Sequence, residues 1–145
     1  MFDQGTGAFD HARFLETLAR ADGPRLKALA ETLLAQLGDV EVVQSRTGLV
    51  MLPMRDTVQG TDFHLGEVLV AEAHIRAAGT EGYGMVVGRD LERAMAMALI
   101  DAAMAAGIGA DAITGFVRFE ATVIAAADTD RLRAVEATRV EMETF

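Results

Sequence analysis

The sequence predicts a single α+β domain over residues 1–145, with an N-terminal helical hairpin, a four-stranded, mainly antiparallel sheet, and two or three C-terminal helices. Three observations lead to this fold class. Apolar residues recur at helical spacing near both ends of the chain, β-branched and apolar runs fill its middle, and the length is close to that of one domain. Short connections between successive strands favour antiparallel neighbours.

The first helical region covers residues 8–37. Between Asp10 and Arg20, apolar side chains fall three and four positions apart, as they do on one face of a helix. The Asp-Gly-Pro sequence that ends at Pro24 interrupts this pattern, and proline suits the first turn of the next helix. A stripe of leucines follows, and Gly38 is a natural C-terminal stop. These signals predict two helices joined by a tight turn.

Four runs in the middle of the chain have the composition of β-strands. A tight turn at residues 46–48 is expected to separate the first two runs, and Gly79 and Gly82 should form the turn before the last run. Pro53 lacks a backbone N–H, so the second strand should end there or lie at a sheet edge. The four expected strands are residues 40–45, 49–56, 63–77 and 83–87.

The next predicted element is a helix that is apolar on nearly all sides. Asp90 is a suitable N-cap, and Glu92 suits the positive end of the helix dipole. Between residues 94 and 106, Asp101 is the only charged residue, so this helix should be buried on more than one side. Gly107 is expected to end it.

Residues 111–127 are expected to form another helix, with a strand as the alternative because β-branched residues are frequent there. The Asp-Thr-Asp sequence at residues 128–130 can cap a final helix over residues 131–142. Either two or three helices therefore follow the sheet.

The composition excludes several classes of protein. The net charge is −9 and Lys27 is the only lysine, so the chain is a poor candidate for binding nucleic acid. The absence of cysteine excludes disulfides, thiolate metal sites and cysteine nucleophiles. No apolar run is long enough to cross a membrane, and the N-terminus lacks the features of a signal peptide. We therefore expect a cytoplasmic protein.

The glycine-rich stretch over residues 82–94 invites comparison with phosphate-binding loops. Its glycines are spaced two and four positions apart, whereas a dinucleotide-binding fingerprint needs spacings of two and three. We therefore interpret Gly88 as a sharp exit from a strand into the helix that Asp90 caps. Arg89 is the only side chain there that would favour an anion, and the acidic residues of the first helical turn would oppose one.

The histidines leave a metal site open as an alternative. His64 and His74 could meet across the sheet, with Glu67 or Glu72 as a third zinc ligand, but surface or hydrogen-bonded histidines are the favoured interpretation. A second alternative is a general base at His74 beside Glu72. His11 has no metal-binding spacing to the other two.

Asp101 is the charged residue that most needs an explanation. A carboxylate inside an apolar helix is costly unless it is paired or protonated. We expect a structural ion pair with Arg89, Arg93 or Arg118, and the alternative is a catalytic acid.

Four stretches of the chain resemble one protein family, the G subunit of the bacterial carbon–phosphorus lyase core complex. The third stretch is the most specific. The last one departs from the family, because Glu141-Met142-Glu143 stands where an aspartate and paired phenylalanines are usual. The four stretches are RTGLVML at 46–52, FHLGEVLVAEAHIR at 63–76, GYGMVVGRDLERAMAMALIDA at 82–102, and ATRVEMETF at 137–145.

The resemblance assigns no catalytic, cofactor-binding or metal-binding residue to this chain. Some polar and glycine positions belong to the matching motifs without a known role. These motif residues are Gly88, Arg89, Asp90, Asp101, Thr138 and Arg139.

The resemblance implies a required, non-catalytic subunit of a cytoplasmic complex. The G, H, I and J subunits form the core of that complex. With an ATPase-like L subunit, G, H and I transfer the ribose triphosphate moiety of ATP to an alkylphosphonate such as methylphosphonate and release adenine. The product is α-D-ribose 1-methylphosphonate 5-triphosphate. ATP is thus a substrate of the complex, and no cofactor is expected on this chain alone. The iron–sulfur chemistry belongs to the J subunit, which fits a chain without cysteine.

Two other kinds of function compete with this one. The chain could be a homo-oligomeric small-molecule-binding or structural protein without its own chemistry, and a homodimer of the isolated chain is compatible with either case. It could also be a self-sufficient small-molecule enzyme that uses Arg89, Asp101 and His74.

Overall fold

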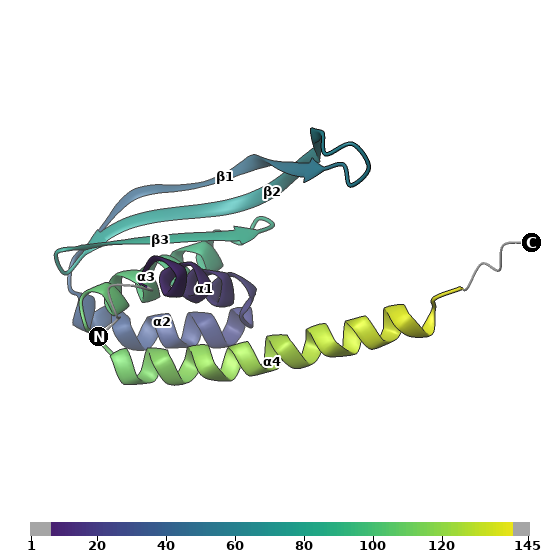
Figure 1. Cartoon of the computed structure of the whole chain (residues 1–145). Coiled ribbons are helices and arrows are strands. Elements are labelled where there is room, and N and C mark those ends of the chain that lie inside the picture. The colour runs from purple at the N-terminus through teal and green to yellow at the C-terminus, as the bar shows by residue number, and fades with distance from the viewer. Residues whose placement is uncertain (1–6, 141–145) are drawn as a thin grey trace, which may run out of the picture.

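The structure, a computed structural model, describes residues 7–140 and confirms the α+β class (Figure 1). The predictions for Glu141-Met142-Glu143 and for the end of the last helix lie outside the described residues. Two helices precede an antiparallel sheet, and two helices follow it. The elements are α1 (Gly7–Arg20), α2 (Gly23–Leu37), β1 (Val40–Arg55), β2 (Asp62–Ala77), β3 (Thr80–Val87), α3 (Leu91–Ala105) and α4 (Ala110–Ala137).

The sheet has three strands in the order β1-β2-β3, so the prediction of four strands is wrong. The expected turn at residues 46–48 is part of one continuous strand, because Arg46 and Gly48 pair with Glu72 and Val70 of β2. β2 is itself sixteen residues long and offers a ladder along the whole of β1, which outweighs a local turn signal. Pro53 lies in the edge strand, beside a register shift, as proline in a sheet should.

The turn between β2 and β3 consists of Ala78 and Gly79. Both have positive φ, at 51° and 74°, as in the two-residue hairpin turn that matches strand twist. The prediction for Gly79 is therefore confirmed, and the prediction that Gly82 belongs to the turn is wrong. Gly82 pairs with Ile75 inside β3 and is buried.

Two glycines of β3 let α3 approach the sheet closely. A Cβ atom at Gly82 would collide with the carbonyl oxygen of Ala98, and one at Gly84 with that of Ala94. Ala94 and Ala98 lie four positions apart, on one face of the helix. Strand and helix therefore touch backbone to backbone, and no larger residue fits between them.

The prediction that α3 is buried on more than one side is confirmed. Nine of its residues are buried, from Ala94 to Ala103. β3 and β2 cover one side, and α2 packs along another. Asp90 caps the helix as predicted, with its carboxylate accepting a hydrogen bond of 2.9 Å from the backbone N–H of Arg93.

The predicted hairpin of the first two helices is not confirmed as a packed pair. α2 packs along α3, whereas α1 packs against α4, β3 and α3. The local signals did hold for α2, since Pro24 lies in its first turn and Gly38 ends it with a φ of 72°. The structure adds a cap at Asp22, which accepts the N–H of Arg25. The two helices are consecutive, but each takes its main contacts from later elements.

α4 is a single helix of 28 residues, so the predicted break at residues 128–130 is wrong. Asp128 does not cap a new helix. Its carboxylate instead accepts hydrogen bonds of 2.6 and 3.2 Å from Arg20 of α1. Thr129 donates its hydroxyl to the carbonyl of Ala125, within the helix. The distal half of α4 runs past the body of the protein (Figure 1).

Candidate functional site

The part of the β1–β2 hairpin that extends beyond β3 forms a projecting arm. We call residues 48–69 the β-arm, because β3 pairs with β2 only from Val70 onward. Leu49 and Met51 are 63% and 56% exposed, and their neighbours Val50 and Leu52 are exposed as well. Successive residues of a strand point to opposite faces, so the β-arm presents apolar side chains on both of its faces. Such a surface is typical of a protein–protein contact.

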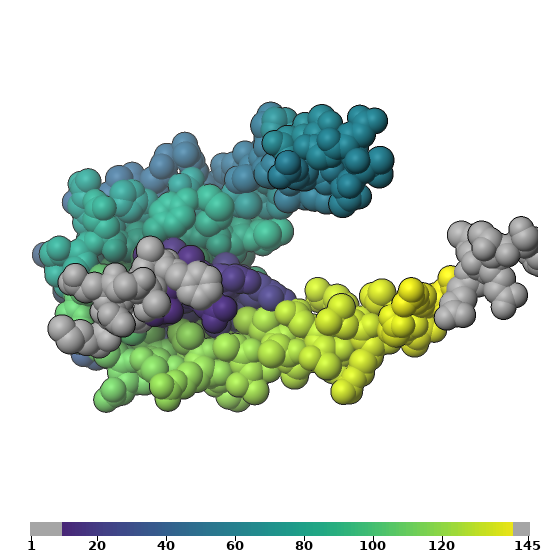
Figure 2. Space-filling model, viewed as in Figure 1, coloured from purple at the N-terminus to yellow at the C-terminus, as the bar shows by residue number. Residues whose placement is uncertain are grey.

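Exposed apolar side chains also occur along α4 from Phe119 onward, a segment called outer α4 below, and they lie on more than one side of the helix. The β-arm and α4 project from the same side of the body, and Figure 2 shows an open gap between them. An apolar surface that its own fold leaves uncovered indicates contact with another molecule. The large apolar residues that α4 exposes are Phe119, Val123, Leu132 and Val135.

The open face of the sheet carries a hydrogen-bonded group of polar side chains. The hydroxyl of Tyr83 donates to Glu72 over 2.9 Å, and Arg46 Nε donates to the other oxygen of Glu72 over 3.1 Å. The Tyr83 and Arg46 hydrogen bonds lower the pKa of Glu72. Burial, followed by the neighbouring Glu72 carboxylate, raises the pKa of Tyr83 to about 12. The group is therefore a fixed, ionised carboxylate held between a neutral phenol and a guanidinium.

The structure does not bring the histidines together. His64 and His74 lie ten positions apart on β2, which is about 33 Å along a strand. The alternative that His64 and His74 meet across the sheet as zinc ligands is therefore wrong. Glu72 is occupied by Tyr83 and Arg46, and the nearest carboxylate to His74 is that of Glu81, 3.7 Å away. Within the described residues, no group of three or more His, Asp or Glu side chains could hold a metal ion.

Asp101 has partners that the sequence did not suggest. Its carboxylate lies 2.9 Å from Nε2 of His11 in α1 and accepts the backbone N–H of Tyr83 over 3.0 Å. The expected pairing with Arg89, Arg93 or Arg118 is wrong. Asp101 is only 6% exposed, so the two hydrogen bonds satisfy a buried carboxylate and tie α1 and β3 to α3.

Arg93 acts elsewhere in the fold. Its guanidinium donates hydrogen bonds of 2.9 and 2.7 Å to the carbonyl oxygens of Ala19 and Ala21, at the end of α1. These are carbonyls that a helix C-terminus leaves unpaired, and the positive charge suits the negative end of the helix dipole. Arg93 is therefore a structural link between α3 and α1.

Glu120 of α4 is a buried charge that the sequence analysis missed. It is 1% exposed and accepts hydrogen bonds from Arg25 Nε, at 2.6 Å, and from the backbone N–H of Asp22, at 3.3 Å. Arg25 also lies over the ring of Phe119, 5.3 Å from its centre. Glu120 thereby fixes the start of α2 against α4. Its partners lie 95 and 98 positions away in the sequence, so only the tertiary structure identifies it.

The strand-to-helix exit behaves as the sequence predicts. Gly88 has a φ of 106°, which only glycine adopts readily. Asp90 is engaged by the N–H of Arg93 and by Lys27, whose Nζ lies 3.0 Å away. Arg89 is exposed, and the structure assigns it no role. The start of α3 therefore holds its own carboxylate where a phosphate loop would hold an anion.

Thr138 and Arg139 finish α4. The backbone N–H and hydroxyl of Thr138 both donate to the carbonyl of Val135, at 3.1 and 2.9 Å. Arg139 forms an exposed ion pair of 3.4 Å with Glu136. Both motif residues therefore contribute to the helix end. No helix in the described part of the chain is long and apolar enough to span a membrane.

These features define a class of protein: a small α+β protein with a closed body and two projecting apolar surfaces, suited to assembly with other chains. Comparison with known proteins makes this specific. The model of the family described as phosphonate metabolism protein PhnG matches residues 10–145, and the chain belongs to this family. The resemblance seen in the sequence is confirmed, and the chain has a role in phosphonate metabolism.

A relative from Stutzerimonas stutzeri is named as the C-P lyase subunit protein HtxH. It is 32% identical over 107 residues, which cover 65% of this chain and 29% of the relative. The chain therefore matches less than a third of that relative's length. A C-P lyase subunit works within a complex of several chains, which agrees with the uncovered apolar surfaces described above.

Proposed function

We propose that this chain is a required, non-catalytic subunit of the complex that transfers the ribose triphosphate moiety of ATP to an alkylphosphonate such as methylphosphonate. In that reaction a phosphonate oxygen bonds to C1′ of the ribose while the bond from C1′ to the adenine nitrogen breaks, and adenine leaves. The proposal rests on family membership and on one observation, the apolar surface of the β-arm and of outer α4.

The charge of the chain supports a non-catalytic role. ATP and a phosphonate together carry several negative charges, and sites for them use clustered Arg and Lys. This chain has a net charge of −9 and a single lysine. Lys27 is already engaged by Asp90 and Glu92, at 3.0 and 3.6 Å. The substrate contacts therefore come from the partners, and ATP is a substrate of the complex and no cofactor of this chain.

The partners in this proposal are the H, I and J subunits and the ATPase-like L subunit. The β-arm and outer α4 contact the core subunits and become buried on assembly, as in an obligate interface. The complex works in the cytoplasm, where ATP is available.

The first experiment measures assembly. The tagged chain is co-expressed with the H, I and J subunits of the same organism, and the purified fraction is analysed for all four. We expect co-purification of the four chains, and its loss in a Leu49→Ser, Met51→Ser double variant of the β-arm. Val42→Ser is the matched control, since Val42 is also half exposed but lies at the other end of β1. Release of the wild-type chain without partners would contradict the proposal.

The second experiment measures the reaction. Adenine release from ATP and methylphosphonate is followed with H, I and L, with and without this chain. We expect release only when this chain is present, and none from this chain alone. Full activity without the chain would show that it is not required. Activity of the isolated chain would instead support a self-sufficient enzyme.

A further inference from the structure

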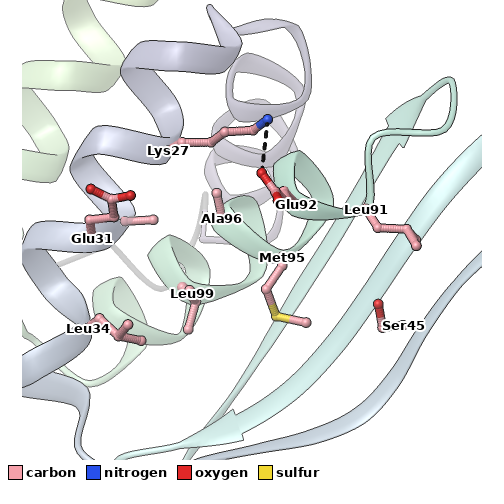
Figure 3. Close-up of a pocket in the computed structure, with 10 residues that line it drawn as sticks. Lys27, Glu31, Leu34, Ser45, Leu91, Glu92, Met95, Ala96 and Leu99 are labelled. Atoms are coloured by element: carbon pink, nitrogen blue, oxygen red, sulfur yellow. Dashed lines mark ion pairs between the residues drawn. The ribbon is translucent and has the colours of Figure 1, made fainter.

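A groove lies between α2 and α3, separate from the β-arm and from outer α4. It has a volume of about 370 Å³ and is bounded at one end by Ser45 of β1. Figure 3 shows Leu34 of α2 beside Leu99 of α3, with Met95 next to them. Leu34 and Leu91 are 45% and 39% exposed, so the lining is an apolar surface in water.

The rim of the groove is acidic. Glu31 and Glu92 line it, and within the described residues the Glu31 carboxylate makes no hydrogen bond or ion pair. Lys27 is the only cation that lines the groove, and Asp90 and Glu92 both engage it. The two lining carboxylates, together with that of Asp90 beside Lys27, outnumber the one ammonium group. The rim therefore repels anions such as ATP or a phosphonate and attracts a ligand that carries positive charge.

The dimensions of the groove suit a helix. On α2, the lining runs from Lys27 to Leu34, which is about 10 Å at 1.5 Å per residue, or two helical turns. On α3, it runs from Leu91 to Leu99, a similar length. An apolar groove of this length with a charged rim is the pattern by which proteins accept an amphipathic helix. Met95 adds a flexible side chain that adapts to the shape of the bound helix.

We propose that this groove binds an amphipathic helix of another subunit of the complex, whose apolar face is flanked by lysine or arginine. The apolar side chains of that helix lie on Leu34, Met95 and Leu99, and its cations face Glu31 and Glu92. The charge complementarity selects this occupant over a second copy of the chain, which is itself strongly acidic. The inference rests on the proposed function, because it names one contact within that complex.

The test is site-specific photocrosslinking in the assembled complex. A benzophenone amino acid replaces Leu34, and in a control it replaces Gln36, an exposed residue of the same helix that does not line the groove. The crosslinked peptide is identified by mass spectrometry. We expect Leu34, and not Gln36, to crosslink to a segment of another subunit with apolar residues three and four positions apart, flanked by Lys or Arg.

Charge reversal gives a second, independent readout. Glu31→Lys is expected to lower the crosslinking yield from the benzophenone at position 34 on the order of fivefold, because an attraction at the rim becomes a repulsion. Asp111→Lys makes the same change of charge at an exposed position of α4 and should leave the yield unchanged. When Glu31 is retained, the crosslinking yield from position 34 should also fall as the salt concentration is raised.

The outcomes separate the inference from the function on which it rests. If the complex assembles but Leu34 crosslinks to nothing, to an acidic segment or to a second copy of this chain, the groove proposal is wrong and the proposed function stands. An unchanged yield with Glu31→Lys would refute the charge argument. If the wild-type complex does not assemble at all, the proposed function fails, and the groove proposal fails with it.

Discussion

The two halves of β2 differ in how far their side chains are buried, although they form one uninterrupted strand. Residues 70–77 belong to the closed body, where Ala71, Ala73 and Ile75 are fully buried beneath α3. Residues 62–69 belong to the β-arm, where Phe63 and Leu65 are 45% and 60% exposed. The difference shows that this chain completes its own core in only part of its sheet. The apolar side chains of the rest stay uncovered by this chain's own fold.

The largest expected difference between the body and the β-arm is in the effect of a glycine substitution on the free energy of unfolding. Gly84→Val forces a side chain into the carbonyl of Ala94, and we expect a loss of about 3 kcal/mol or more in the free energy of unfolding, or no folding at all. A Cβ atom at Gly66 in the β-arm would meet no atom within 4 Å, so Gly66→Val should leave the stability nearly unchanged. Denaturant unfolding of both variants measures the difference. Equal effects would remove the distinction between body and β-arm.

The next test concerns two carboxylates of α4, one buried and one exposed. Glu120→Gln removes a charged acceptor that is 1% exposed, and we expect a loss of about 1–3 kcal/mol in the free energy of unfolding. The control is Glu136→Gln, whose exposed pair with Arg139 is screened by water, so its unfolding curve should overlay the wild-type curve. The prediction is wrong if Glu120→Gln unfolds like the control.

The polar group on the open face of the sheet gives a smaller expected effect, a shift in the pKa of Tyr83. The tyrosine absorbance reports on this residue alone, because Tyr83 is the only tyrosine. Its ionisation, followed by ultraviolet absorbance, should have a midpoint near a pKa of about 12, and Glu72→Gln should move the pKa of Tyr83 part of the way back toward 10.0. Burial is the larger cause and persists in the variant. A midpoint near 10.0 in the wild-type protein would show that Tyr83 is not held against Glu72.

These two pKa shifts also fix the direction of the pH dependence. The pKa of Tyr83 is raised on folding, so its contribution to stability is complete below pH 10.0 and is lost as the pH rises toward about 12. The pKa of Glu72 is lowered on folding, so its contribution is present above pH 4.5 and is lost as the pH falls below that value. Thermal unfolding across both ranges checks the signs.

The smallest expected effect lies in the β-arm itself. Leu65→Ala removes a side chain that the fold leaves 60% exposed, so the free energy of unfolding of the isolated chain should change by less than about 0.5 kcal/mol. Denaturant unfolding measures this change. A loss of the size seen for buried leucines, about 2–5 kcal/mol, would place Leu65 in a core that the β-arm does not have.

Local patterns predicted much of the body but failed where a distant segment decided the outcome. The cap at Asp90, the stop at Gly38 and the burial of α3 were readable, because each depends on residues within one or two turns. The turn expected at residues 46–48 was wrong, because β2 pairs straight through it. The break expected at residues 128–130 was wrong, because Arg20 engages Asp128 within a continuous helix.

The polar contacts show the same limit. The apolar neighbours of Asp101 predicted its burial and its need for a partner. They could not predict His11, which lies 90 positions away in the sequence. Glu120 gave no signal, because its pairing with Arg25 spans 95 positions. The leucines and methionines of the β-arm have the pattern of an ordinary buried strand. The sequence alone does not show that β3 ends beside them and leaves them exposed.

The fastening of α1 has a consequence for the order in which the protein folds. His11 bonds to Asp101, 90 positions later in the sequence, and Arg20 bonds to Asp128, 108 positions later. The guanidinium that binds the carbonyl of Ala19 belongs to Arg93, 74 positions later. During synthesis the first helix therefore leaves the ribosome before any of these partners exists. Closing such long loops is slow compared with forming local contacts. We therefore expect the first helix to be made to be among the last to dock, and a nascent chain that stops before α4 lacks the Asp128 carboxylate that Arg20 binds.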